Sequence, residues 1–356
     1  MFKIKLNSLL ILGTLLLVSC VKDKPVADEE SGFLHGAYIN NEGAFGNSNG
    51  SVSYFDTDSV IMINHVFESV NGRPLGDVVQ SVSIAGDKAF IVVNNSQKIE
   101  IVDLKTFASI GSIEGLEYPR DFLAINAHKG YLTDGNFAGR VYVIDFTSLT
   151  ITDTIPCGNG PDKMVLYENT VLVANSGGWG NDSTLTVIDT ENDQVTETWV
   201  VGLNPANLVL DREGQLWVLC KGKVVWNPDY SIGEETTSSL VILDPRSGEL
   251  KQSTPIGSVG DYYWPQRLSI NKNKDQIYYL EAEGIYVRGI NGTGGGDKPL
   301  ISGSLYGFGI DPVTNLIYAL YAPSFTTSGW MFRYKPDGIM LDSLEVGIGP
   351  SQIVFN

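Results

Sequence analysis

The chain has little of what metal sites and nucleic-acid contacts are made from. It holds three histidines (His35, His65 and His128) and three cysteines in 356 residues, and no two histidines have the spacing of a metal-binding pair. Lysine and arginine number 24 against 41 acidic residues, for a formal net charge of −17. Because so acidic a body is repelled by phosphate backbones, the composition argues against a nucleic-acid partner.

Catalytic signatures are also scarce. The chain contains no phosphate-binding P-loop. None of its histidines falls among the residues that we expect to line the central channel of the predicted fold. Asp121 and Asp162 are carboxylates that would suit a hydrolase, but they are equally suited as ion-pair partners of Arg120 and Lys163. We therefore expect a binding protein that is not an enzyme and needs no catalytic cofactor or metal.

The first twenty residues predict export and lipidation. Lys3 and Lys5 form a positive segment, and the apolar run that follows is too short to remain as a membrane-spanning helix. Leu17-Val18-Ser19-Cys20 matches a lipobox, which predicts removal of residues 1–19 and acylation of Cys20. An ordinary signal peptide with an incidental cysteine is the alternative.

Residues 20–32 are rich in charge and predict a tether. An acidic stretch behind a lipidated cysteine resembles the surface-export signal of Bacteroidetes lipoproteins. That resemblance implies an outer-membrane lipoprotein exposed at the cell surface, with a periplasmic position as the alternative. Cys157 and Cys220 are the remaining thiols. They could be joined in a disulfide, but the apolar residues beside them favour two reduced, buried cysteines that pack as small hydrophobic side chains.

From residue 33 onward the chain alternates short runs rich in Val, Ile, Leu and Tyr with Gly, Asn and Asp turns, which predicts strands. The opening strands recur about forty residues apart, the length of a four-stranded propeller blade. One longer interval comes from an insertion between Lys221 and Ser239, expected to be a loop. The first core residues of the opening strands are Val82, Phe122, Met164, Leu208, Leu268, Phe308 and Ile353.

The two ends of the chain complement each other. The last strand, around Ile353, has no unit after it, whereas Gly36–Asn40, Gly50–Asp56 and Val60–Phe67 supply three strands without an opening one. We therefore predict an all-β fold, a single seven-bladed propeller of four-stranded antiparallel blades over residues 33–356. The C-terminal strand closes the ring by joining the N-terminal blade, which leaves no open sheet edge.

Propeller topology places the start of each opening strand and the loop after each second strand on one face. Aromatic side chains beside amides on that face suit a ligand with apolar surfaces and many hydrogen-bonding groups; packing of several rings between blades is the alternative. The predicted ligand-binding face contains Asn40, Asn41, Glu42, Phe45, Gln80, Asn94, Asn95, Arg120, Asp121, Asp134, Asn136, Phe137, Asp162, Lys163, Asn175, Trp179, Asn207, Trp226, Tyr230, Tyr263, Trp264, Gln266, Arg267, Tyr306, Tyr321 and Gln352.

The repeated unit resembles the YncE-type surface propellers. More narrowly, the chain resembles the BtuG-type cobalamin-binding surface lipoproteins of gut Bacteroidetes, in its lipobox and tether, Asn40-Asn41-Glu42-Gly43, residues 174–180 and the aromatic insertion after Lys221. The resemblance implies non-covalent capture of vitamin B12, a corrinoid, on one propeller face and transfer to a TonB-dependent outer-membrane transporter. A propeller that binds a glycan or peptide, and a lyase or hydrolase, are the alternatives.

Overall fold

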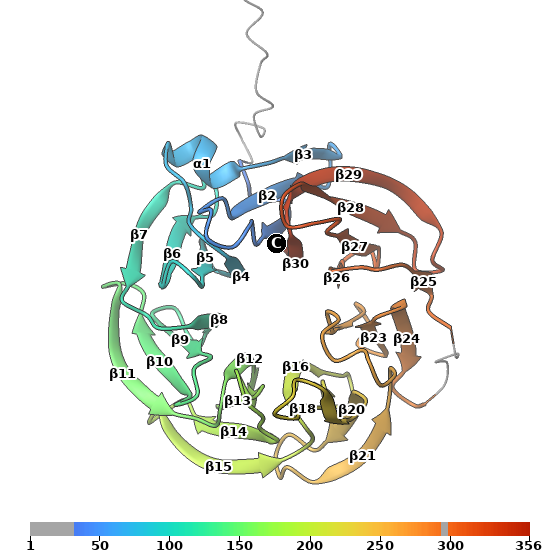
Figure 1. Ribbon diagram of the computed structural model, residues 1–356. Coiled ribbons are helices and arrows are strands. Elements are labelled where there is room, and N and C mark those ends of the chain that lie inside the picture. The colour runs from blue at the N-terminus through green and yellow to red at the C-terminus, as the bar shows by residue number, and fades with distance from the viewer. Residues whose placement is uncertain (1–31, 293–297) are drawn as a thin grey trace, which may run out of the picture.

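The computed structural model describes residues 32–292 and 298–356. The predicted signal peptide, the lipidated Cys20 and the tether up to residue 31 lie outside the described residues. Within the described part, seven four-stranded antiparallel sheets surround a central channel, as the sequence predicted (Figure 1). No helix among these residues is long and apolar enough to cross a bilayer.

Each blade runs from an innermost opening strand at the channel to an outermost fourth strand at the rim. Blade 1 contains β30 (Pro350–Phe355), β1 (Gly36–Asn41), β2 (Ser51–Asp56) and β3 (Ile61–Ile63). Blade 2 contains β4 (Val79–Ala85), β5 (Lys88–Val93), β6 (Lys98–Asp103) and β7 (Ser109–Glu114). Blade 3 contains β8 (Pro119–Ala124), β9 (Lys129–Asp134), β10 (Arg140–Asp145) and β11 (Thr150–Pro156).

The remaining blades follow the same plan. Blade 4 contains β12 (Pro161–Tyr167), β13 (Thr170–Asn175), β14 (Thr184–Asp189) and β15 (Gln194–Val200). Blade 5 contains β16 (Pro205–Leu210), β17 (Leu216–Cys220), β20 (Ser239–Leu243) and β21 (Leu250–Pro255). Blade 6 contains β22 (Arg267–Ile270), β23 (Gln276–Glu281), β24 (Gly284–Gly289) and β25 (Ile301–Ser302). Blade 7 contains β26 (Gly307–Ile310), β27 (Ile317–Tyr321), β28 (Ser328–Tyr334) and β29 (Met340–Ile348).

The ring closes as predicted. The C-terminal β30 pairs antiparallel with β1 in blade 1, with Ile39 opposite Ile353 and Tyr38 opposite Val354. All three side chains Tyr38, Ile39 and Ile353 are buried. Closure by strands from both ends of the chain removes the unpaired edge that an open array of blades would expose.

The hydrophobic core lies between neighbouring blades. The second strand of a blade is almost wholly buried, as in β5 and β17, whereas fourth strands such as β15 are mostly exposed. At the boundary of blades 2 and 3, for example, the rings of Phe90 and Phe122 stack with their centroids 4.0 Å apart. Each blade therefore buries both faces of its inner strands, which is why those strands consist of nearly continuous apolar residues.

Two local elements differ from the sequence-based prediction. The segment from Val60 to Phe67, expected as one strand, is β3 followed by the short helix α1 (Val66–Asn71). His65 adopts a left-handed conformation, with φ at 56°, which turns the chain so that the side chains of Val66 and Phe67 enter the core. A six-residue helix is too short to show helical periodicity in the sequence.

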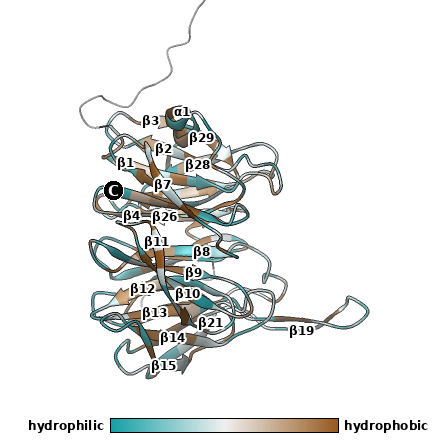
Figure 2. Cartoon of the chain, turned by 90° about the vertical axis from the view of Figure 1, so that its left-hand side faces the viewer, coloured by the Kyte–Doolittle hydropathy of each residue, from teal (hydrophilic) through white to brown (hydrophobic). Residues whose placement is uncertain are grey.

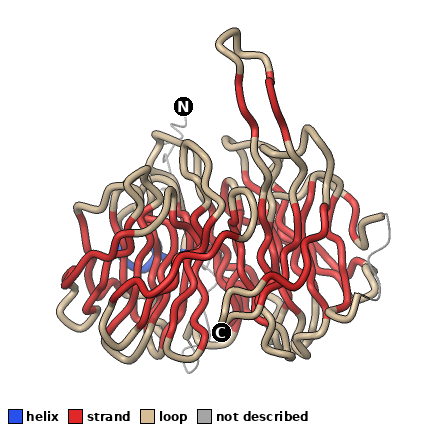
Figure 3. The backbone as a smooth tube through the Cα atoms, turned by 90° about the horizontal axis from the view of Figure 1, so that it is seen from below, coloured by secondary structure: helices blue, strands red, loops and turns tan. Residues whose placement is uncertain are grey.

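The insertion in blade 5, expected as a loop, contains a β-hairpin of β18 (Val224–Trp226) and β19 (Ile232–Glu235). It projects from one face of the disc, and the C-terminus lies on the opposite face (Figures 2 and 3). We call the face with this hairpin the hairpin face. It is the face on which the sequence placed the candidate ligand-binding residues.

The two cysteines within the described residues are free thiols. Cys220 at the end of β17 is fully buried and Cys157 is half-buried. Burial raises the pKa of both thiols to about 12. Of the two alternatives left by the sequence, the structure supports small buried hydrophobes and not a disulfide.

Candidate ligand-binding site

The opening strands of blades 3 to 5 each begin with a proline and a β-bulge. Pro119, Pro161 and Pro205 are the first residues of β8, β12 and β16, positions where a proline is tolerated in a sheet. The pairing register shifts directly after each proline. A bulge releases residues from the ladder and redirects their side chains, so the residues after these prolines turn toward the channel.

The bulged residues of blades 3 and 4 form two reciprocal ion pairs. Arg120 Nη2 lies 3.3 Å from Asp162 Oδ2, and Lys163 Nζ lies 2.6 Å from Asp121 Oδ1. Arg120 also donates a hydrogen bond from Nη1 to Gln80 Oε1 at 3.0 Å. Burial opposes ionisation of Asp162, but the charges of Arg120 and Lys163 outweigh it and lower the pKa of this carboxyl.

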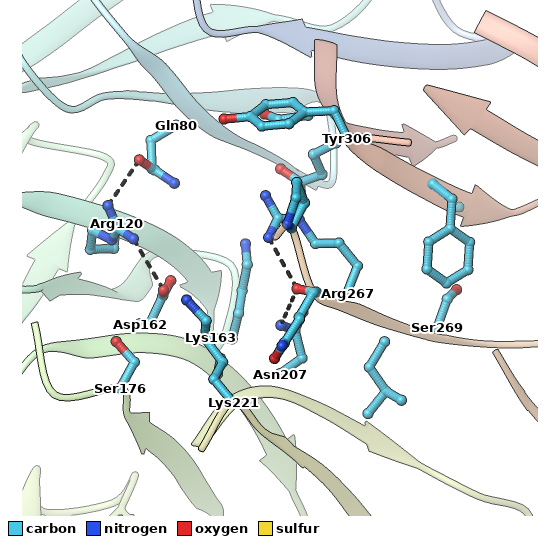
Figure 4. Close-up of a pocket in the computed structure, with 18 of the residues that line it drawn as sticks. Gln80, Arg120, Asp162, Lys163, Ser176, Asn207, Lys221, Arg267, Ser269 and Tyr306 are labelled. Carbon is cyan, nitrogen blue, oxygen red and sulfur yellow. Dashed lines mark hydrogen bonds and ion pairs between the residues drawn. The ribbon is translucent and has the colours of Figure 1, made fainter. Parts of the chain in front are cut away.

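Gln80, Arg120, Asp162 and Lys163 line a cavity of about 640 Å³ in the central channel, at its hairpin-face end; the lining continues along the inner strands to Pro312 and Phe355. Among the described residues that line it, the charged ones are four cations, Arg120, Lys163, Lys221 and Arg267, and one carboxylate, Asp162. The four cations come from blades 3, 4, 5 and 6 and point into the same space (Figure 4). The cavity is thus strongly positive although the whole chain is acidic.

Exposed aromatic rings surround the mouth of the cavity. Trp179 is 72% exposed and Tyr263 is 66% exposed, and both line the cavity, as does the partly exposed Trp264. Trp179 contacts the ring of Tyr118 edge-on, and the indole N–H of Trp226 on the hairpin donates to the hydroxyl of Tyr263 at 3.0 Å. These rings are displayed on the surface and do not pack between blades.

The structure gathers about half of the predicted face at this cavity. The predicted residues that line it are Gln80, Arg120, Asp162, Lys163, Trp179, Asn207, Tyr263, Trp264, Gln266, Arg267, Tyr306 and Gln352. Asp121 lines a neighbouring cavity of about 440 Å³, together with Lys163, Asn207 and Gln352. Glu42 accepts a 2.9 Å hydrogen bond from the hydroxyl of Tyr306.

A second group of predicted residues lies on surface loops outside both cavities. Phe45, Phe137 and Tyr230 are exposed without lining either space, and Trp226 reaches the cavity only through its bond to Tyr263. Asn95 donates to Asp77, and Asn136 donates to Glu117. These side chains extend the hairpin face away from the channel.

Five of the six remaining predicted residues are buried. Asn40, Asn41, Asp134 and Asn175 are 0% exposed, and Asn94 is 6% exposed. They hold strands and blades together: Asn175 donates to Thr184 and Thr186, Asn94 donates to the backbone oxygen of Pro119, and Asn40 donates to Ser351. Tyr321 packs against the core of blades 6 and 7. None of these six side chains lines either cavity.

The sequence-based prediction missed Tyr118, Ser176 and Lys221, all of which line the cavity. It also missed Asn204, which is fully buried in a left-handed conformation with φ at 53°. Asn204 Nδ2 donates to the backbone oxygen of Gly222 at 2.9 Å and to the hydroxyl of Tyr262 at 3.3 Å. The Asn-Pro pair at residues 204–205 was the available signal, because Asn favours turns and left-handed backbone.

Residues 46–50 have the G-x-S-x-G spacing of a hydrolase nucleophile elbow. That motif requires a sharp turn from a strand into a helix, whereas this segment lies in the loop between the antiparallel strands β1 and β2. In the described part of the chain, no group of three or more His, Cys, Asp or Glu residues is placed to hold a metal ion.

Residues 35–336 match the family described as a domain of unknown function, DUF5074. The chain belongs to this family. No curated protein matches this DUF5074 chain in sequence.

Three solved structures share the fold of this DUF5074 chain. A quinonprotein alcohol dehydrogenase-like protein from Bacteroides thetaiotaomicron is 16% identical, with a TM-score of 0.65 over 91% of this chain and 78% of that one. A functionally unknown protein from Desulfotomaculum acetoxidans is 14% identical, with a TM-score of 0.65 over 90% and 98%. A putative 6-phosphogluconolactonase from Bacteroides fragilis is 12% identical, with a TM-score of 0.64 over 90% and 98%. At these identities the likenesses establish the propeller architecture alone.

Proposed function

We propose that this DUF5074 propeller is a cell-surface lipoprotein that captures a corrinoid at the cavity on its hairpin face. It then passes the corrinoid to a TonB-dependent outer-membrane transporter. The observation that carries the proposal is the combination of exposed rings around a cavity lined by amide and cationic side chains. Concave sites with apolar walls and a few fixed polar groups are typical of small-molecule binding.

The chemistry of a corrinoid suits this arrangement. Its peripheral amides need hydrogen-bond donors and acceptors, which Gln80, Asn207 and Gln352 supply at the cavity wall. Its apolar edges would lie against the exposed rings of Trp179 and Tyr263. Aromatic rings contribute large contact areas with little loss of side-chain entropy.

Binding is favoured over catalysis by the way the channel carboxylates are held. Burial raises the pKa of Asp121 although Lys163 opposes the shift, whereas the pKa of Asp162 is lowered. Opposed shifts also occur in acid–base sites. Here, however, Asp121 and Asp162 each face a cation of the neighbouring blade, which supports a role for both carboxylates as inter-blade contacts.

Calorimetry and visible absorbance with cyanocobalamin test the proposal. We expect one-to-one binding and a spectral shift. Trp179→Ala and Tyr263→Ala should each weaken affinity about tenfold or more, which corresponds to about 1.4 kcal/mol. Trp330→Ala is the matched control, because Trp330 is a partly exposed tryptophan on β28 that lines neither cavity. Absence of both heat and spectral change with the unmodified protein would overturn the corrinoid assignment.

A further inference from the structure

Two of the four cations in the cavity have no carboxylate partner. Arg120 and Lys163 are paired with Asp162 and Asp121. Among the described residues, however, no ion pair is formed by Lys221, directly after β17, or by Arg267, at the start of β22. Within the described part of the chain, Arg267 Nη1 donates only to the backbone oxygen of Gln266 at 3.1 Å. The ammonium of Lys221 lies 4.9 Å from the ring centroid of Tyr262.

The residue directly before Arg267 carries a side-chain amide without a partner. Gln266 lines the same cavity and is 2% exposed, yet neither its Oε1 nor its Nε2 makes a hydrogen bond within the described protein. A buried amide left without partners destabilises a folded protein, so native structures rarely retain one. An unpaired amide donor next to unpaired cations is the arrangement that a bound oxyanion would satisfy.

The electrostatic surroundings of Lys221 also favour a bound anion. Burial lowers the pKa of Lys221 to about 8; the charges of Arg267 and Arg120 add to this effect, and the charge of Asp162 opposes it. The cations of the cavity therefore repel one another in the unliganded protein, and a bound anion would relieve that repulsion. Because the chain as a whole carries a formal charge of −17, a positive cavity of this kind is a local feature of the fold.

We propose that Lys221, Arg267 and Nε2 of Gln266 form an oxyanion subsite that binds a phosphate or carboxylate group of the ligand captured in the cavity. This deepens the proposed function and rests on it, since the same cavity is used. Arg267 provides the planar donor set that suits carboxylate and phosphate oxygens, and Lys221 provides a point charge. A corrinoid that carries a nucleotide loop has such a group in its phosphodiester.

Protection of Lys221 from acylation tests the subsite directly. The protein is treated with an N-hydroxysuccinimide ester in chloride, inorganic phosphate or acetate at equal ionic strength, and acylation is followed by peptide mass spectrometry. We expect millimolar phosphate or acetate to slow acylation of Lys221 several-fold. Lys251, which is exposed on the outer strand β21, serves as an internal control and should react at the same rate in all three salts.

Two variants extend the test. Arg267→Gln should abolish the protection of Lys221, whereas Lys251→Gln, which also removes one positive charge, should leave it unchanged. Stronger protection by phosphate than by acetate assigns a phosphate ligand, and the reverse order assigns a carboxylate. Equal Lys221 rates in all three salts in the unmodified protein overturn the subsite, and that measurement does not depend on whether any variant folds.

Failure of the subsite and failure of the corrinoid proposal give different results. Anion protection of Lys221 without cyanocobalamin binding would keep the subsite and reject the corrinoid. Cyanocobalamin binding that Arg267→Gln leaves unchanged, with no protection by either anion, would keep the corrinoid and reject the subsite.

Discussion

Lys163 of blade 4 and Asp121 of blade 3 face each other across the channel side of their shared boundary, with Nζ 2.6 Å from Oδ1. The preceding residues are paired in the opposite sense, Arg120 of blade 3 with Asp162 of blade 4. Each opening strand thus contributes one cation and one carboxylate to its neighbour. The reciprocal arrangement links β8 and β12 at the point where their bulges leave both strands without ladder bonds.

Lys163→Met is expected to lower the free energy of unfolding by about 2 kcal/mol. Removing one partner of a buried ion pair leaves a charge unpaired, and the effect is moderated because the Lys163 side chain is 26% exposed. Asp121→Asn should cost less, since burial already raises the pKa of Asp121. Denaturant unfolding of both variants and of the double variant measures the coupling; strictly additive effects would contradict a direct interaction.

Glu281→Gln is expected to stabilise the protein at pH 8 and to change its stability little at pH 4 to 5. Glu281 is 3% exposed; its Oε1 accepts from Ser238 at 3.0 Å, while Oε2 has no partner within the described protein. Burial raises the pKa of Glu281 from 4.5 to about 7. Because the pKa is raised in the folded state, the stability that the Glu281 carboxyl contributes is fully present below about pH 4.5 and is lost as pH rises through about 7.

The stabilisation by Glu281→Gln at pH 8 should be on the order of 2–3 kcal/mol. Urea unfolding at pH 5 and pH 8 measures it. Glu249→Gln, an exposed carboxylate on the surface of blade 5, is the matched control and should show no comparable difference between the two pH values. A Glu281→Gln protein that is equally stabilised at both pH values would be inconsistent with a buried titrating carboxyl.

Asn204→Ala is expected to lower the free energy of unfolding by about 3 kcal/mol. About 1 kcal/mol comes from placing alanine in a left-handed conformation, and about 2 kcal/mol comes from the four lost side-chain hydrogen bonds, at about 0.5 kcal/mol each. Asn204 Nδ2 donates to Asn181, Gly222 and Tyr262, and Oδ1 accepts from the backbone N–H of Asp182. Asn204→Gly loses the same bonds but keeps the backbone conformation, so it should cost about 1 kcal/mol less; equal losses would indicate that the conformation is unimportant.

Deleting residues 350–356 is expected to abolish cooperative unfolding. β30 is the innermost strand of blade 1, and its loss would expose the inner edge of β1 and the buried side chains of Tyr38 and Ile39. Circular dichroism melting and size-exclusion chromatography should show a broad transition and aggregation. Deletion of Asn356 alone is the control and should retain a single sharp transition; a well-folded monomer without β30 would show that ring closure is dispensable.

Much of the architecture was accessible from the sequence because a propeller blade is a local unit. The opening strands around Val82, Phe122 and Met164 were found from their spacing, and the pairing of β30 with β1 followed from two incomplete units at the chain ends. The helix α1 and the β18–β19 hairpin escaped this reasoning. Both consist of elements of three to six residues, too short for a periodic signal.

The residues of the candidate site could be predicted from the sequence only in part. Asn175 and Gln80 were assigned to the same face, but Asn175 is buried against Thr184 and Thr186 within its blade, whereas Gln80 lines the cavity. Which way an amide near a strand end points depends on the groups packed around it, and a sequence does not state them. Lys221 was missed for the same reason, since its position after Cys220 shows nothing of its proximity to the cavity.

By itself, the sequence determined the all-β class, the seven blades, the closure of the ring and the face that carries aromatic and amide residues. These features depend on strand periodicity and on residues close together in the chain. Only the tertiary structure decided which amides are buried, how Asp121 and Asp162 are paired, and that Lys221 and Arg267 meet an unpaired Gln266 in one cavity. The physical reason is that charge balance and hydrogen-bond satisfaction depend on side chains from different strands and blades, which meet only when these elements pack together.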